Sequence, residues 1–252
     1  MSSSPPVVLT FAASDPTGGA GLQADILAIA ALGCHPISVV TALTVQNTSG
    51  VSAMRAVEAG LVAEQARCVL ADIAVAAFKT GVLASAENVR AIAALLAEYP
   101  EVPLVVDPVL ASGRGDALAS EEVVLAIKEK LMPLATVATP NSIEAQRLGG
   151  APRLLELGCR FVLVTGSHAD TAEVINTLYD AGGVAREDRW PRLPGSYHGS
   201  GCTLASAIAA SMAKGSDVKQ AVGLAQEYTW KALAGGFRPG AGQFIPNRLF
   251  AR

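Results

Sequence analysis

The sequence predicts an α/β fold in which a mostly parallel sheet is covered by helices on both faces, with a small antiparallel addition. The first observation is that short apolar runs rich in β-branched residues alternate with stretches whose apolar residues recur at helical spacing. The second is that these runs are almost continuously apolar, which is typical of strands buried on both faces of a parallel sheet. No internal repeat, charge run or composition shift divides the chain. We therefore expect a single domain over residues 1–252.

The elements can be placed in order from these patterns and from the residues that end them. The apolar runs predict strands at Pro6–Ala12, Pro36–Val45, Val51–Val57, Ala76–Thr80, Pro103–Asp107, Thr136–Thr139, Phe161–Thr165, Ala172–Tyr179 and Gly183–Trp190. Helical spacing predicts helices at Leu22–Leu32, Leu61–Ile73, Ala86–Tyr99, Ser120–Leu131, Ser142–Leu148, from about Gly201, and at Val218–Ala234. Gly33 and Gly235 end two of these helices. The turn Asp180–Gly183 makes the last two strands a hairpin, which is the antiparallel addition.

Composition and charge exclude several classes of protein. The formal net charge is −3 and Lys and Arg are not clustered, so no nucleic-acid surface is expected. The four cysteines form no C-x-x-C pair, which argues against a zinc site or a disulfide framework and favours a reducing compartment. The apolar stretches are short and interrupted, and no secretory leader is evident, so no membrane span is expected. These features favour a cytoplasmic protein that acts on small molecules.

Polar residues that follow strands are candidates for a site, because ligands of open α/β sheets bind beyond the carboxyl ends of the strands. Gln46, Asp107, Asn141 and Thr165 stand at such positions, and Gly18–Gly21 follows the first strand. These glycines match neither a dinucleotide fingerprint nor a P-loop. They either let backbone approach a flat small ligand or form a tight turn into a helix. Gln46 either offers a donor and an acceptor to an amino-substituted heterocycle or bonds only to nearby backbone.

The segment His198–Thr203 is the most informative motif. Gly199 and Gly201 bracket Ser200 directly before a small-residue helix, so the amides of this turn can face an anion at a helix N-terminus. The helix field would favour the thiolate of Cys202, as a proton acceptor or nucleophile beside that anion. The alternative is a plain loop before a packed helix, with Cys202 as a small buried residue. No G-x-S-x-G elbow is present, so a Ser-His-Asp hydrolase is not indicated.

Asp107 and Glu144 are separated carboxylates that can hold Mg²⁺ directly or through water, because this ion prefers oxygen ligands and keeps several waters. Asn141 is placed to cap the helix that carries Glu144. Asp107 taken alone is also explained as a helix cap or a solvated strand end.

Several motifs, taken together, carry a resemblance to a known family. They are Ala13–Asp25, Thr41–Thr48, Lys79–Leu83, Asp107–Val109, Thr139–Asn141 and His198–Thr203, and they follow one another across nearly the whole chain. In this combination the chain resembles the hydroxymethylpyrimidine/phosphomethylpyrimidine kinases of thiamine biosynthesis, which are ribokinase-like. The resemblance implies a three-layer α/β/α fold and a homodimer. It also implies transfer of phosphate from ATP, with Mg²⁺, to the hydroxymethyl group of a pyrimidine and then to the resulting monophosphate.

The resemblance also assigns roles by matching position. It places Gln46 at the edge of the pyrimidine, with Ala20, Thr44, Val82 and Val109 around the ring. It places Cys202 where many sugar kinases have an aspartate base, and the amides of Gly199, Ser200 and Gly201 around the transferring phosphoryl group. Asp107 and Glu144 would serve Mg²⁺ and the phosphates, and Asn141 and Thr165 the nucleotide.

The chain departs from this family pattern at three places. Val82 replaces the usual methionine in the ring pocket, and Thr165 replaces a lysine that contacts nucleotide phosphates in many members. Between Gly149 and Arg160 only Arg153–Leu157 is left for a helix that is normally longer. Two other functions therefore stay open. One is a pyridoxal kinase-like vitamin kinase, and the other is a non-catalytic protein that senses a pyrimidine.

Overall fold

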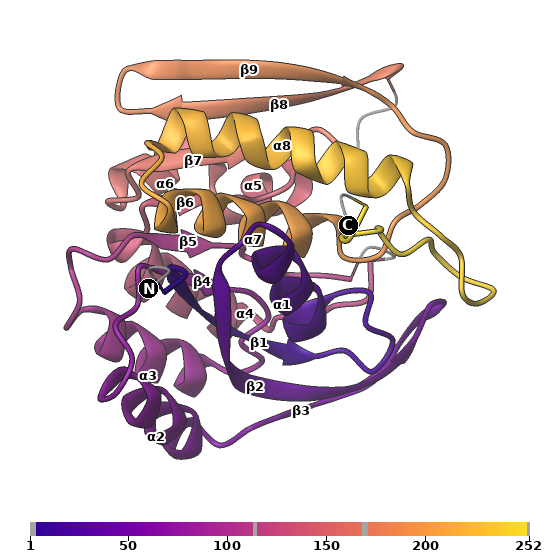
Figure 1. Ribbon diagram of the computed structural model, residues 1–252. Coiled ribbons are helices and arrows are strands. Elements are labelled where there is room, and N and C mark those ends of the chain that lie inside the picture. Colours follow the sequence, from indigo (N-terminus) through magenta and orange to yellow (C-terminus); the bar gives the residue numbers. More distant parts are fainter. Residues whose placement is uncertain (1–3, 113–114, 168–170, 251–252) are drawn as a thin grey trace.

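The computed structural model describes residues 4–112, 115–167 and 171–250 of the chain. Within this part the strands form one nine-stranded sheet in the order β3-β2-β1-β4-β5-β6-β7-β8-β9 (Figure 1). The strands are β1 (Val7–Ser14), β2 (His35–Asn47), β3 (Gly50–Ala56), β4 (Ala77–Thr80), β5 (Leu104–Val106), β6 (Val137–Ala138), β7 (Phe161–Val164), β8 (Glu173–Asp180) and β9 (Gly183–Pro191). Neighbours pair in parallel from β2 to β7, whereas β3 at one edge and β8 with β9 at the other pair antiparallel.

Helices cover both faces of this sheet, which gives three layers. On one face lie α1 (Gly21–Ala31), α7 (Ser200–Ala213) and α8 (Val218–Ala234), and on the other lie α2 (Ala59–Leu70), α3 (Ala86–Leu96), α4 (Glu121–Ala126), α5 (Ser142–Leu148) and α6 (Gly150–Glu156) (Figure 1). Strand β1 shows how the sequence builds both layers, because successive side chains of a strand point to opposite faces. Leu9 and Phe11 belong to the core on one face and Val8 to the core on the other. The predicted three-layer fold is confirmed.

Helix α7 is the central helix of its layer and is buried over almost its whole length, from Cys202 to Ser211. Its buried positions are mostly small side chains, so it can lie close to the sheet, to α1 and to α8 at once. A helix enclosed in this way has its N-terminus fixed relative to the strand ends. The position of the preceding glycine turn is therefore set by the core of the protein.

The predicted elements all occur in the predicted order, and their boundaries mostly agree to within a few residues. Strand β2 runs on to Asn47, so Gln46 lies in a strand opposite Val51 and not in a loop, because β3 supplies an antiparallel ladder. The helix predicted over Ser120–Leu131 is α4 followed by a π turn at Ile127–Leu131. Pro133, which cannot donate a backbone hydrogen bond, then brings the helical path to an end in a short 3₁₀ turn.

Between Gly149 and Arg160, where the sequence predicts a helix over Arg153–Leu157, α6 begins three residues earlier, at Gly150. Gly149, in the left-handed conformation, is the C-cap residue of α5 and the N-cap residue of α6, so the two helices follow each other directly.

Among the described residues, no helix combines the length and apolar character needed to cross a membrane.

Candidate active site

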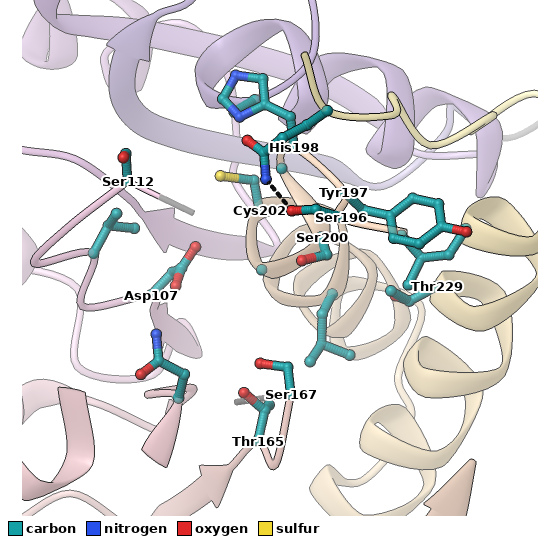
Figure 2. A pocket seen from close by; sticks show the side chains of 18 of the residues that line it. Asp107, Ser112, Thr165, Ser167, Ser196, Tyr197, His198, Ser200, Cys202 and Thr229 are labelled. Carbon is teal, nitrogen blue, oxygen red and sulfur yellow. Dashed lines mark hydrogen bonds between the residues drawn. The ribbon is translucent and has the colours of Figure 1, made fainter. Parts of the chain in front are cut away.

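A cavity of about 430 Å³ lies where the parallel strands end at their carboxyl termini, beside the start of α7 (Figure 2). All residues predicted for the site line it: Ala20, Thr44, Gln46, Val82, Asp107, Val109, Asn141, Glu144, Thr165, Gly199, Ser200, Gly201 and Cys202. They come from loops and strand ends far apart in the sequence. The fold therefore brings the predicted residues together, while their individual roles stay predictions.

Gln46 and Thr44 form one end of the cavity. The Gln46 amide nitrogen donates a hydrogen bond of 2.8 Å to the Thr44 hydroxyl, which itself donates to the Ser14 carbonyl at 2.8 Å. This chain of bonds fixes the orientation of the Gln46 amide. One amide hydrogen and the carbonyl oxygen of Gln46 then remain for a ligand. The simple alternative, in which Gln46 bonds only to backbone, is wrong, because its partner is a side chain.

Asp15 ties the two glycine turns together, a role that sequence patterns did not indicate. Its buried carboxylate accepts hydrogen bonds from the amides of Thr17 and Ala20, at 2.8 and 2.7 Å, and contacts His198 Nε2 at 2.8 Å. Burial alone would raise the pKa of Asp15, but the bonds from His198, Thr17 and Ala20 lower it. The loop after β1 is thereby joined to the segment before α7.

Gly199 precedes α7 in a conformation that only glycine adopts readily, with φ of +78°. A Cβ atom there would lie 2.0 Å from the Gly19 carbonyl oxygen, so the close approach of the two turns also requires glycine. No described side chain caps the N-terminus of α7. The first amides of this fourteen-residue helix therefore stay available to an anion.

Cys202 lies in the first turn of α7 with its sulfur at the cavity (Figure 2). Burial raises the pKa of its thiol to about 12, although Lys79 and the Gly21 amide act in the opposite direction. The direction of this pKa shift is opposite to the one expected from the helix field. The reason is that burial, a tertiary effect, outweighs the local field of the helix.

Asp107 follows β5 and faces Cys202 across the cavity floor. Burial raises the pKa of Asp107 to about 6, and the nearby charge of Lys79 limits the rise. Its Oδ2 atom is buried without a hydrogen-bond partner in the part of the chain that the structure describes. A Cβ atom at Gly201 would lie 3.8 Å from each carboxylate oxygen, so the carboxyl group abuts the first turn of α7. Asp107 is thus neither a helix cap nor a solvated strand end.

Glu144 is held by backbone on the same side of the cavity. Its two oxygens accept from the amides of Leu110, at 3.1 Å, and Asn141, at 3.0 Å. Asn141 in turn caps α5 by accepting from the amides of Ile143 and Glu144, so the predicted cap is confirmed as a full capping box. Burial, and then the charge of Asp107, raises the pKa of Glu144 to about 7.

These two carboxyl groups fit Mg²⁺ when phosphate and water supply the other ligands. No cluster of three or more His, Cys, Asp or Glu side chains in the described residues is arranged to hold a metal ion by itself. Asp107 offers a buried oxygen that accepts no hydrogen bond from the described residues, and Glu144 lies near enough for the charge of Asp107 to add to the effect of burial on its pKa. Mg²⁺ is commonly bound in this way, by one or two carboxylates, several waters and substrate phosphates.

An ion pair lies beneath the site, and sequence patterns gave no sign of it. The Lys79 ammonium lies 2.9 Å from both carboxylate oxygens of Asp25, and both side chains are fully buried. Asp25 also accepts from Thr10 at 2.6 Å and Ser206 at 2.8 Å. Gly81 leaves room for this lysine, because a Cβ there would lie 2.8 Å from Lys79 Nζ. The pair joins β1, β4, α1 and α7 directly below Cys202.

At the far end of the cavity the predicted Thr165 lies with residues that sequence reasoning missed. Thr165 and Ser167 line it after β7, on the side opposite Thr229 of α8 (Figure 2). Among the lining residues that the structure describes, Arg192 is the single Lys or Arg side chain. It donates to the Ser167 carbonyl at 2.9 Å and to the Thr171 carbonyl at 2.6 Å. A guanidinium group is therefore anchored to the backbone of Ser167 and Thr171.

The same end offers aromatic surface and a hydroxyl group. The rings of Trp190 and Trp230 stack with their centroids 6.2 Å apart, and both residues line the cavity. Thr229 Oγ1 is buried and has no partner in the described structure. A flat ring with polar edges would find both stacking and hydrogen-bonding groups here.

Comparison with known proteins identifies the family. The phosphomethylpyrimidine kinase family model matches residues 15–247. The chain belongs to this family. It is 43% identical over 254 residues to the hydroxymethylpyrimidine/phosphomethylpyrimidine kinase of Streptomyces coelicolor, a match that covers 94% of this chain and 92% of that protein. The predicted family is confirmed, and with it the prediction that the chain is a phosphotransferase.

Two solved structures place this phosphomethylpyrimidine kinase family member among vitamin kinases. The phosphomethylpyrimidine kinase of Clostridium difficile is 34% identical, covers 90% of this chain and 99% of its own, and has a TM-score of 0.79. The pyridoxal kinase of Staphylococcus aureus in complex with AMP-PCP and pyridoxal is 25% identical, covers 99% and 96%, and has a TM-score of 0.89. The ribokinase-like fold is therefore shared by kinases of both substrates.

Proposed function

We propose that this chain transfers the terminal phosphoryl group of ATP to the hydroxymethyl group of 4-amino-5-hydroxymethyl-2-methylpyrimidine and then to the resulting monophosphate. The observation that carries the proposal is the shared cavity of Gln46, Cys202 and the uncapped amides of α7. These groups match the three parts of the reaction, which are the aminopyrimidine edge, the acceptor hydroxyl and the transferring phosphoryl group.

Gln46 recognises the pyrimidine by its edge. With its amide held by Thr44, it presents one N–H donor and one carbonyl acceptor. The 4-amino group of the pyrimidine is a donor and the neighbouring ring nitrogen is an acceptor, so the two edges are complementary. The apolar residues predicted around the ring, Ala20, Val82 and Val109, line the cavity together with Thr44. Val82, in place of methionine, leaves more room beside the ring.

The turn before α7 stabilises the transferring group. Amides at a helix N-terminus attract negative charge, and charge on the phosphoryl oxygens is stabilised by fixed donors that need no reorganisation. The amides of Ser200 and Gly201 belong to the first turn of α7 and line the cavity. Gly199 allows this turn to approach the loop after β1, which brings the phosphoryl group to the substrate hydroxyl.

Cys202 receives the proton of the substrate hydroxyl. A free thiolate is not required, because the Asp107 carboxyl group lies near the thiol in the same cavity. The sulfur can pass its own proton to the Asp107 carboxylate as it takes the proton of the hydroxyl. Burial raises the pKa of this carboxyl group to about 6, so it is a better proton acceptor than an ordinary Asp side chain.

ATP and Mg²⁺ occupy the remaining cavity in this proposal. The base lies toward Trp190 and Thr229, and the phosphates pass Thr165, Asn141 and Arg192 on the way to α7. Arg192 supplies the positive charge that a lysine at position 165 would otherwise provide. Asp107 and Glu144 would hold Mg²⁺, which would neutralise phosphate charge.

We also propose a single cytoplasmic domain that forms a homodimer. One continuous sheet supports a single domain, and the four free cysteines are compatible with a reducing compartment. Size-exclusion chromatography with light scattering tests the dimer.

Two variants test the assignment of the site. Cys202→Ala is expected to lower kcat at least about 100-fold and to leave the Kd of the pyrimidine nearly unchanged, because it removes a contact made during proton transfer. Gln46→Ala is expected to raise that Kd about tenfold or more, with a smaller effect on kcat. Calorimetric titration and steady-state kinetics give both quantities. Wild-type kcat in Cys202→Ala, or wild-type Kd in Gln46→Ala, removes the corresponding assignment.

A further inference from the structure

Arg248 carries a positive charge into the interior of the protein. Its side chain is only 3% exposed, in the C-terminal segment that lies beside the start of α7 (Figure 1). A buried charge is costly unless it is paired or well hydrogen-bonded. None of the ion pairs formed by the described residues includes Arg248. The carboxylates of Asp15 and Asp25 act on it only at longer range.

The hydrogen bonds of this guanidinium go to the two glycine turns of the site and to the first turn of α7. Nε donates to the Thr203 hydroxyl at 2.9 Å, and Nη1 donates to the Gly18 carbonyl at 3.4 Å. Nη2 donates to the carbonyls of Gly19 and, at 3.4 Å, Gly199. The planar fork of arginine can span these acceptors, which a lysine could not do.

These contacts orient the peptide group that opens α7. The Gly199 carbonyl accepts from Arg248, from the Thr203 amide at 3.0 Å and from the Thr203 hydroxyl at 2.8 Å. In a planar trans peptide the N–H points opposite to the carbonyl. The Ser200 amide, which shares this peptide group, is therefore directed away from Arg248, and Ser200 lines the cavity.

We propose that Arg248 is a positioning residue for phosphoryl transfer. It holds the Gly199–Ser200 peptide so that the amide faces the phosphoryl group, and it locks the loop of Gly18 and Gly19 against this turn. Its charge adds to the positive potential at the N-terminus of α7, so the transferring phosphate is the counter-ion that the interior does not supply. This inference rests on the proposed kinase function.

The main-chain position of Arg248 is itself secured by the core. The Tyr228 hydroxyl donates to the Arg248 carbonyl at 2.8 Å, and the Asn247 amide donates to the Ala232 carbonyl at 2.9 Å. The end of the chain is thus fastened to α8 on one side and to the glycine turns on the other. A structural role alone would predict loss of stability when Arg248 is changed, but no selective loss of turnover.

Chemical rescue of Arg248→Ala separates the two roles. The wild type is first assayed with the hydroxymethylpyrimidine and ATP; if it is inactive, the proposed function fails, independently of Arg248. In an active protein, Arg248→Ala is expected to lower kcat at least about tenfold while the Kd of the pyrimidine changes less than about twofold. Guanidinium at millimolar concentration is expected to restore kcat, whereas urea, its uncharged analogue, is not.

Two further variants keep the result decisive. Arg248→Met fills the space without charge and is expected to lose kcat as Arg248→Ala does; it replaces that variant if Ala does not fold. Arg238→Ala is the matched control, because Arg238 is an exposed arginine of the same C-terminal segment that also donates to carbonyls. It is expected to keep wild-type kcat. Wild-type kcat in Arg248→Met, or equal rescue of Arg248→Ala by urea, overturns the proposal.

Discussion

At the scale of single residues, the buried carboxyl group of Asp107 lowers the free energy of unfolding at neutral pH. Its carboxyl group is 4% exposed and one of its oxygens has no partner among the described residues, so ionisation is unfavourable in the folded protein. The pKa is raised from 3.8 to about 6 chiefly by burial. The pKa of Asp107 is higher in the folded than in the unfolded protein. The stability that the protein has below pH 4, where Asp107 is protonated, is therefore partly lost as the pH rises through about 6.

Asp107→Asn is therefore expected to increase the free energy of unfolding at pH 8, by about 1 to 3 kcal/mol, and to have little effect at pH 4. Urea unfolding followed by circular dichroism at the two pH values measures this difference. The control is Asp72→Asn, which changes an exposed carboxylate and should shift neither value. A variant less stable than wild type at pH 8 contradicts the account of Asp107.

Arg192 makes a second prediction at this scale. Arg192→Gln is expected to raise the KM for ATP about tenfold, because charge-assisted hydrogen bonds to phosphate are lost. The Kd of the pyrimidine should not change, because Gln46 binds at the other end of the cavity. Arg189→Gln is the matched control, since Arg189 is an exposed arginine of β9 that pairs with Glu187.

A second substitution tests whether the charge itself matters. Adding Thr165→Lys to Arg192→Gln should restore ATP affinity, because it returns a cation to the position that a lysine occupies in many members of the family. Steady-state kinetics with varied ATP give the KM of all four proteins. An unchanged KM in Arg192→Gln would remove Arg192 from the nucleotide site.

At the scale of elements, the buried pair of Lys79 and Asp25 connects strands and helices under the site. Its members are 54 residues apart in the sequence, and no local pattern relates them. Removing one partner leaves the other charge buried and unpaired, which typically costs about 3 to 5 kcal/mol. Removing both charges avoids that penalty.

Lys79→Met alone is therefore expected to lose about 3 to 5 kcal/mol of unfolding free energy, and Lys79→Met with Asp25→Asn to regain much of it. The asparagine side chain introduced at position 25 could still accept from Thr10 and Ser206, which donate to Asp25 in the native protein. Urea unfolding of the double variant and of both single changes forms a double-mutant cycle. Simple additivity of the two single effects would argue against a coupled pair.

The elements also mark where prediction from sequence succeeds. Helix α8 occurs over the predicted residues, because amphipathic spacing and a glycine stop are local signals. Strand β2 is longer than its sequence pattern predicts, because its last residues pair with β3, and this pairing continues past a register shift between Val45 and Gln46. The thiolate expected at Cys202 is disfavoured for the same kind of reason, because the burial that raises the pKa of this thiol is a tertiary effect.

At the scale of the whole molecule, the predicted site residues converge because parallel strands end at one edge of the sheet. Topology can be inferred from the alternation of strands and helices, so these residues can be expected to meet. Residues that act by long-range contact cannot be found in this way. Arg248 reaches Gly19 across 229 positions, and the contact of Arg192 with the Ser167 carbonyl depends on how the hairpin of β8 and β9 folds back.

Substrate choice is the property of the whole molecule on which the account depends most. The fold is shared with a pyridoxal kinase at a TM-score of 0.89, so architecture does not decide between the two substrates. Gln46 is complementary to an aminopyrimidine edge, whereas the ring of pyridoxal carries no amino group. The sensor alternative, in turn, predicts binding without phosphoryl transfer.

The most direct measurement is therefore a parallel determination of kcat/KM for the hydroxymethylpyrimidine, its monophosphate and pyridoxal, with ATP and Mg²⁺ under one set of conditions. The account predicts turnover of the first two compounds, with kcat/KM for the hydroxymethylpyrimidine at least about 100-fold above that for pyridoxal. Phosphorylation of pyridoxal alone, or binding of the pyrimidine with no transfer from ATP, would contradict it.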